Sequence, residues 1–106
     1  MTQGKAIQLA QFQEFDAKRV VSKLLHDSAK CRVVLFCLEP GQEVLPHQSS
    51  SEVIFYGVAG QSRVLVGTEE VGLATESIVV CPPQLLHGIK AEARATILAI
   101  IAPRPE

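Results

Sequence analysis

Two histidines lie where this chain is expected to reach the ends of β-strands, and β-barrels commonly place a binding site at such ends. His47 follows Pro46 at the expected beginning of a strand, and His87 follows the sequence PPQLL, a turn stiffened by two prolines. Imidazole is the commonest protein ligand of transition metals. A catalytic metal generally needs three or four protein donors, so two histidines alone do not complete such a site. The third histidine, His26, lies in an expected polar turn and is interpreted as a surface residue.

Short apolar runs rich in β-branched residues, separated by turn residues, predict the elements that position these histidines. We expect strands at 18–25, 31–38, 52–58, 62–66, 77–81 and 96–101. Helical periodicity is weak, which favours an all-β sandwich or small barrel over a βαβ fold. Residues 9–15 are expected to form either a short helix or an edge strand. The whole chain, 1–106, is predicted to be a single domain with its core barrel at about 18–103.

The composition allows a buried core and disfavours several classes of partner. Hydrophobic residues make up 47% of the 106 residues and charged residues 20%, which is typical of a globular domain. The net charge is −1 with no basic block, so no nucleic-acid partner is expected. No apolar run approaches the roughly 20 residues that span a bilayer, and no signal peptide is evident at the start. We therefore expect a cytoplasmic protein that does not insert into membranes.

The three cysteines are expected to be reduced thiols. Cys31 and Cys37 would lie roughly 20 Å apart along one strand, which is too far for a disulfide. Cys81, just before Pro82, could offer a soft metal donor, but a packed thiol is the simpler interpretation.

The spacing of glycine, histidine and proline resembles the two sequence motifs of the cupin family. Gly41, five residues and then His47 resemble the opening of the first motif, G-x5-H-x-H-x3,4-E-x6-G, and Gly60 lies at its closing glycine. Pro82 and His87 resemble the second motif, G-x5-P-x-G-x2-H-x3-N. The resemblance covers most of the chain. It implies a jelly-roll β-barrel, commonly a homodimer, with a pocket inside the barrel mouth.

The departures from these motifs concern the residues that bind metal in the family. Family members use two histidines and a glutamate from the first motif and one histidine from the second. His47 and His87 occupy two of these positions, whereas Ser49 occupies the second histidine position and Val53 the glutamate position. Glu52 lies one residue before that position. Three other positions of the second motif also differ, with Glu76 and Gln84 replacing glycines and Ala91 replacing asparagine.

Strand register decides whether Glu52 can serve as a ligand, because successive side chains of a strand point to opposite faces. If His47 and Ser49 face the barrel interior, Val53 and Phe55 face it too, and Glu52 points outward. A β-bulge in the serine run before Glu52 would reverse this and bring the carboxylate inward. Tyr56 and Gly60 keep their usual motif spacing, which favours the unshifted register.

Two functions of different classes fit these residues. The first is a pocket that binds a small molecule with weak or incomplete metal coordination, and acid–base catalysis by the two histidines is its variant. Its predicted lining is His47, Ser49, Val53, Phe55 and His87. The alternative is a metal-dependent enzyme, such as a dioxygenase or an isomerase, with iron, manganese, nickel or zinc on the two histidines and Glu52 or water completing the site. The loss of two ligand positions favours the first function.

Overall fold

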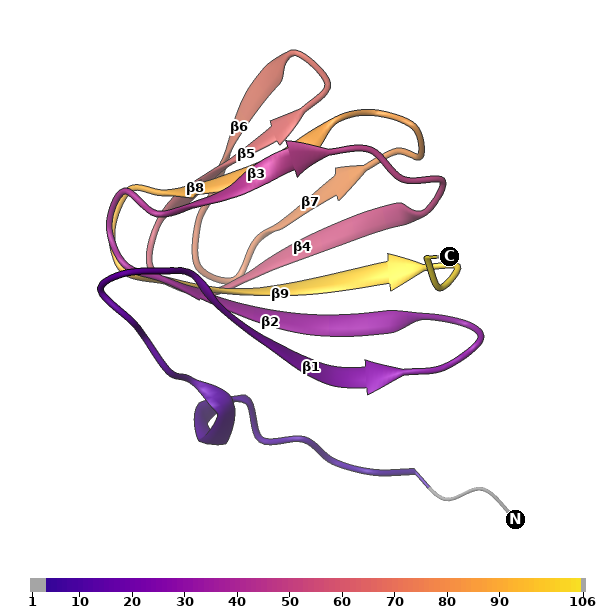
Figure 1. Ribbon diagram of the computed structural model, residues 1–106, viewed down its shortest axis with the longest axis horizontal. Coiled ribbons are helices and arrows are strands. Elements are labelled where there is room, and N and C mark those ends of the chain that lie inside the picture. Colours follow the sequence, from indigo (N-terminus) through magenta and orange to yellow (C-terminus); the bar gives the residue numbers. More distant parts are fainter. Residues whose placement is uncertain (1–3, 106) are drawn as a thin grey trace.

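The computed structural model describes residues 4–105, which fold into two facing antiparallel β-sheets (Figure 1). The larger sheet has the strand order β1-β2-β9-β4-β7. Its strands are β1 (Val21–Asp27), β2 (Arg32–Leu38), β9 (Ala95–Ala102), β4 (Glu52–Ala59) and β7 (Ile78–Cys81). The smaller sheet has the order β3-β8-β5-β6. Its strands are β3 (Glu43–His47), β8 (His87–Ala91), β5 (Ser62–Val66) and β6 (Glu69–Leu73). This architecture confirms the predicted all-β jelly-roll barrel.

Each predicted strand is present, and the differences concern short segments. β3 and β8, which carry His47 and His87, were not predicted as strands, because one contains a proline and the other a glycine within only five residues. Pro46 is tolerated because β3 lies at the edge of its sheet. His47 therefore ends a strand, and the prediction that it begins one was wrong. His26 lies within β1 and not in a turn.

The N-terminal segment forms only one short helical turn, the 3-10 helix η1 (Leu9–Phe12), and the rest of residues 9–15 is irregular. Figure 1 shows this segment on the side of β1 that faces away from the smaller sheet. Lys23 of β1 holds it through an ion pair with Glu14, in which Nζ lies 2.8 Å from Oε1. Within residues 4–105, no helix is long and apolar enough to cross a membrane.

The hydrophobic core fills the space between the two sheets. On β4 the side chains alternate, with Val53 and Phe55 buried and Glu52 exposed. The larger sheet also contributes Val79, Cys81, Ile97 and Ala99, and the smaller sheet contributes Val64, Leu73, Ile89 and Ala91. Each fully buried Val, Leu, Ile or Phe side chain stabilises the fold by roughly 1.5–3 kcal/mol. Because both sheets bury one face in this core, a shift of any strand by one residue would expose its apolar side chains, so the core also fixes the strand register.

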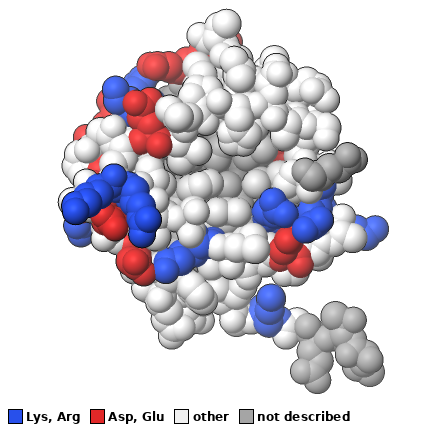
Figure 2. Space-filling view, viewed as in Figure 1, with Lys and Arg blue, Asp and Glu red and all other residues white. Residues whose placement is uncertain are grey.

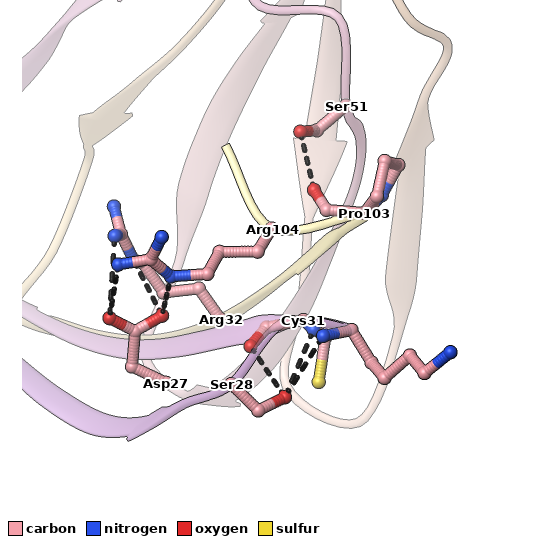
Figure 3. Close-up of polar contacts among 8 residues, drawn as sticks. Asp27, Ser28, Cys31, Arg32, Ser51, Pro103 and Arg104 are labelled. Carbon is pink, nitrogen blue, oxygen red and sulfur yellow. Dashed lines mark hydrogen bonds and ion pairs between the residues drawn. The ribbon is translucent and has the colours of Figure 1, made fainter. Parts of the chain in front are cut away.

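A polar network joins the segment after β9 to one end of the barrel (Figure 3). The Arg104 guanidinium donates to both carboxylate oxygens of Asp27, at 2.6 and 3.1 Å, and Arg32 lies 3.4 Å from each of them. The buried Ser51 hydroxyl donates to the Pro103 carbonyl oxygen at 2.7 Å. The pKa of Asp27 is lowered to about 2, mainly by hydrogen bonds from Arg104. Burial opposes this shift, and hydrogen bonds from Arg32 add to it.

All three cysteines are unpaired, and two of them, Cys37 and Cys81, are buried. Burial raises the pKa of the Cys81 thiol to about 11, so this side chain is a neutral thiol at physiological pH. A neutral thiol is not the form that ligates a metal.

Candidate functional site

His47 and His87 lie opposite each other on neighbouring strands. β3 and β8 pair antiparallel, and the two histidines are partners in that ladder. Their ring centroids are 4.3 Å apart with an interplanar angle of 61°. His87 is 4% exposed, whereas His47 is exposed at the strand end. The ladder is irregular between Val44 and His47, where Pro46 lacks the N–H that a regular ladder needs.

Each imidazole meets a backbone carbonyl through the same ring nitrogen. Nδ1 of His47 lies 3.4 Å from the Leu45 carbonyl oxygen, and Nδ1 of His87 lies 3.4 Å from that of Leu85. A carbonyl only accepts hydrogen bonds, so these contacts place the proton of a neutral ring on Nδ1. Nε2 then carries a lone pair in both rings. Burial, together with the charge of His47, lowers the pKa of His87, although its carbonyl contact opposes this shift.

The histidines border a small cavity between the sheets, with a volume of about 60 Å³. Apart from the two imidazoles, its lining is apolar. The lining residues are Phe36, Val44, His47, Val53, Phe55, His87, Gly88, Ala99 and Ile101. The Phe55 and His87 rings lie 6.2 Å apart between centroids. Gly88 allows β3 to approach, because a Cβ at this position would lie 2.9 Å from the Val44 carbonyl oxygen.

The structure brings together four of the five residues predicted to line the pocket: His47, Val53, Phe55 and His87. Ser49 lies outside this lining and is engaged elsewhere. Its hydroxyl accepts a hydrogen bond from the Ser51 N–H at 3.2 Å, and its carbonyl accepts one from the Gln84 N–H at 2.9 Å.

Glu52 is exposed and pairs with Ala102 of β9, while the adjacent Val53 is buried and faces the cavity. The strand thus has the unshifted register. Within residues 4–105, no group of three or more His, Cys, Asp or Glu side chains is arranged to hold a metal ion. The two imidazoles supply two donors, which is fewer than the three or four of a usual transition-metal centre. The residues present therefore do not fit a complete metal site.

Sequence reasoning missed five lining residues: Phe36, Val44, Gly88, Ala99 and Ile101. Alternation along the predicted strand 96–101 places Ala99 and Ile101 on the same face of that strand. It does not say whether that face, or the face of strand 31–38 that carries Phe36, is inside. Val44 and Gly88 lie on strands that the sequence did not predict. Their position became evident only when β3 and β8 paired.

The two replaced glycines of the second motif keep the backbone shape that glycine favours. Glu76 has a φ of 63° and Gln84 a φ of 72°, and within residues 4–105 they are the only non-glycine residues with positive φ. Gln84 also joins two loops beside the histidines, because its carbonyl accepts a hydrogen bond from Gln48 Nε2 at 2.9 Å. The motif therefore keeps its backbone conformation where it differs in residue type.

A larger open cleft, of about 360 Å³, lies on the outer face of the smaller sheet, and Val44 and Gly88 border both it and the smaller cavity. Its charged lining residues are Glu43, Arg63, Glu70, Lys90 and Glu92. Arg63 and Glu70 form an exposed ion pair, with 3.3 Å between Nε and Oε2. Exposed pairs of this kind are typical of a solvated sheet face and contribute little stability. The smaller cavity combines an apolar lining with two imidazoles, so we take it as the candidate site.

Uncharged side chains cover the centre and upper right of the face shown in Figure 2, while acidic and basic side chains gather at its left and right. Exposed leucines flank both histidines in the chain, with Leu45 before His47 and Leu85 and Leu86 before His87. Exposed apolar side chains therefore lie close to both histidines in the chain.

Comparison with known proteins identifies several relatives of this fold. The family model described as "Cupin domain" matches residues 34–101, which is more than half of the chain. An RmlC-like cupin protein of Desulfovibrio desulfuricans has a TM-score of 0.89 and 26% identity, with 96% of this chain and 99% of that chain covered. The TT1209 protein of Thermus thermophilus has a TM-score of 0.89 and 27% identity, covering 94% and 98%. A search of curated proteins finds no significant match.

Proposed function

Because this chain belongs to the cupin family, we propose that it binds a small molecule in the cavity beside His47 and His87, with weak or incomplete metal coordination. The observation that carries this proposal is the pairing of two imidazoles, 4.3 Å apart between centroids, on an otherwise apolar hollow. Small-molecule sites are typically apolar hollows with a few convergent polar groups. The cavity has this composition on a small scale.

Weak metal coordination follows from the number of donors. The two Nε2 atoms are the donors on offer, Glu52 points outward, and Ser49 carries a neutral hydroxyl, which is a poor ligand for a divalent transition metal. A metal held by two imidazoles would depend on water for its other ligands. Its occupancy would therefore follow the supply of metal.

The alternative function is a metal-dependent enzyme, such as a dioxygenase or an isomerase, that uses iron, manganese, nickel or zinc. The observation that favours it is that each neutral ring carries its lone pair on Nε2, since both Nδ1 atoms meet carbonyls. Two donors do not fit a complete centre, so we derive no reaction step from such a metal.

Elemental analysis after loading with iron, manganese, nickel or zinc tests the metal part of the proposal. We expect clearly less than one metal per chain in protein purified without an affinity tag. Stoichiometric metal that is lost in the His47→Ala/His87→Ala variant would favour the enzyme and contradict weak coordination.

Xenon tests whether the cavity admits a guest, because apolar cavities in proteins bind this atom. We expect xenon pressure to shift the NMR signals of the Ala99 and Ile101 methyl groups. Unchanged signals at these lining residues would overturn the proposed small-molecule site.

We further propose that the protein partner is a second copy of this chain, bound through the outer face of the larger sheet. The register aligns two apolar rows across β2, β9, β4 and β7. These rows, which we call the outer apolar face, are Val33-Ile100-Ile54-Val80 and Leu98-Tyr56-Ile78. Leu35 continues the second row on β2 but is fully buried, so it is not part of this face. Ile78 and Val80 are 60% and 47% exposed. The side chains of these rows carry no charge, and Glu52 lies on the same face only at the first position of β4. The rows can therefore pack on a second copy about a two-fold axis without opposing like charges, which supports a homodimer.

The unpaired thiols of Cys31, Cys37 and Cys81 support a reducing compartment, and we propose the cytoplasm.

A further inference from the structure

We propose that the cavity selects small uncharged molecules that are apolar apart from one hydrogen-bond donor, such as an alcohol, and rejects carboxylates of the same size. This inference rests on the proposed function, because it assigns a class of ligand to the same cavity. Three features of the described residues carry it: the hydrogen bonding of the two imidazoles, the lack of a free cation in the lining, and the volume.

Both imidazoles line the cavity, and each neutral ring has one acceptor nitrogen. Each Nδ1 is turned toward the carbonyl oxygen two residues earlier, at 3.4 Å in both cases, so each neutral ring offers the lone pair of Nε2. A ligand hydroxyl can donate to such a lone pair. A carboxylate has no proton to donate, so it would need a protonated imidazole as its partner. Protonating the buried His87 would place a positive charge in an apolar lining, which burial disfavours.

The remaining lining offers nothing to neutralise an anion. Phe36, Val44, Val53, Phe55, Gly88, Ala99 and Ile101 complete it. The cation that register brings nearest is Arg32, whose partner on β9 is Ile101. Its guanidinium is already engaged with the carboxylate of Asp27, which Arg104 also binds. Moving an ionised carboxylate from water into this lining without a paired charge is strongly unfavourable.

The volume limits the size of the guest. A cavity of about 60 Å³ holds the equivalent of roughly four waters, at about 10–15 Å³ of this volume for each. We therefore expect a molecule, or the part of a molecule that enters, with on the order of five non-hydrogen atoms. Ala99 is a small side chain in the lining, so a larger residue there would fill the space.

A matched pair of probes tests this selectivity: 2-methylpropan-1-ol and 2-methylpropanoate, which share one branched carbon skeleton. Each is titrated at pH 8 in EDTA into 15N-labelled full-length protein, with the amide signals of Val53, Gly88 and Ala99 followed by NMR. We expect the alcohol to bind in the millimolar range and the carboxylate to bind at least tenfold more weakly. Equal or tighter binding of the carboxylate would overturn the inference.

Variants of β9 show whether the probe occupies the cavity. Ala99→Leu should abolish alcohol binding by filling the space, whereas Ala102→Leu, the same change at an exposed position of the same strand, should leave it unchanged. Because Ala99→Leu could unfold the protein, His47→Phe is a second variant at an exposed position. It removes one acceptor and should reduce the tenfold preference for the alcohol.

The two proposals fail in different ways. If xenon enters the cavity but the alcohol does not bind, or binds equally to wild type and Ala99→Leu, the assigned ligand class is wrong and the small-molecule site stands. If xenon does not enter, the proposed function itself is overturned.

Discussion

His47 and His87 are cross-strand partners with unequal surroundings. Their ring centroids are 4.3 Å apart, yet His87 is 4% exposed while His47 is exposed at the end of its strand. Both rings direct Nδ1 toward the carbonyl oxygen two residues earlier. The pair thus joins one buried imidazole, whose pKa is lowered, to one that solvent reaches.

The lowered pKa of His87 predicts a pH dependence of stability. Its folded-state pKa lies below the ordinary value of 6.5, so the unfolded chain binds more protons between the two values. This contribution to stability is complete above about pH 6.5 and decreases as the pH falls through the folded-state pKa. Urea unfolding at several pH values from 7.5 to 5 should show a decrease that is smaller in His87→Gln. The matched control, His26→Gln, removes a histidine outside the cavity lining, and equal curves for His87→Gln and wild type would contradict the prediction.

The outward register of Glu52 predicts that this carboxylate does not bind metal. Glu52→Gln should leave the zinc content of zinc-loaded protein unchanged, because the side chain lies on the opposite face of β4 from the cavity. His47→Ala/His87→Ala should lower whatever zinc is bound. Elemental analysis of the three proteins in parallel makes the comparison. A clear fall in Glu52→Gln would mean that the serine run is bulged and Glu52 faces inward.

The two non-glycine residues with positive φ predict stabilising changes. A left-handed backbone conformation costs a residue with a Cβ roughly 1–2 kcal/mol. Glycine avoids this cost, but it loses more conformational entropy on folding, which offsets part of the gain. Glu76→Gly and Gln84→Gly should each raise the free energy of unfolding by about 0.5–1 kcal/mol in urea titrations. Gly60→Ala, at a φ of 81° and against the Arg94 carbonyl, should destabilise. A loss of stability in both glycine variants would show that their side chains contribute more than the backbone strain costs.

The outer apolar face predicts a dimer that a single charge can disrupt. Ile78→Asp should convert the protein to a monomer of 11.5 kDa, measured by size-exclusion chromatography with light scattering, because it buries a charge in the proposed interface. Leu45→Asp is the matched control, since Leu45 is 73% exposed on the other sheet. A wild-type mass near 11.5 kDa would rule out the homodimer.

The Asp27 network predicts a loss of stability in acid. The pKa of Asp27 is lowered to about 2, so its contribution is complete above its ordinary value of 3.8 and is lost as the pH falls toward 2. Asp27→Asn should lower the urea midpoint at pH 7 and reduce the difference between pH 4 and pH 2.5. Arg104→Gln should act in the same direction, and the double variant should add little, because both changes remove one interaction. Additive effects would show that the two residues act independently.

The alternation of apolar residues and turns was sufficient to predict the all-β class, because strand periodicity is a local property of the chain. The same local counting placed Glu52 outward and Val53 with Phe55 inward, and the structure has this arrangement. Motif spacing likewise indicated the two histidines. These inferences needed only the distance along the chain between one residue and the next.

Only the tertiary structure decided what surrounds those residues. β3 and β8 are too short and too interrupted to be evident from the sequence alone. They form because they pair with each other across a long stretch of chain and because β8 also pairs with β5. The pairing of β3 with β8 brings His47 to His87 and adds Val44 and Gly88 to the lining, whereas Ala99 and Ile101 come from β9 of the facing sheet. Ser49 contacts Ser51 and Gln84 instead of the cavity. The sequence by itself determined which side chains share a face along each strand. The pairing of strands, which depends on contacts between distant residues, decided which faces meet and enclose the cavity.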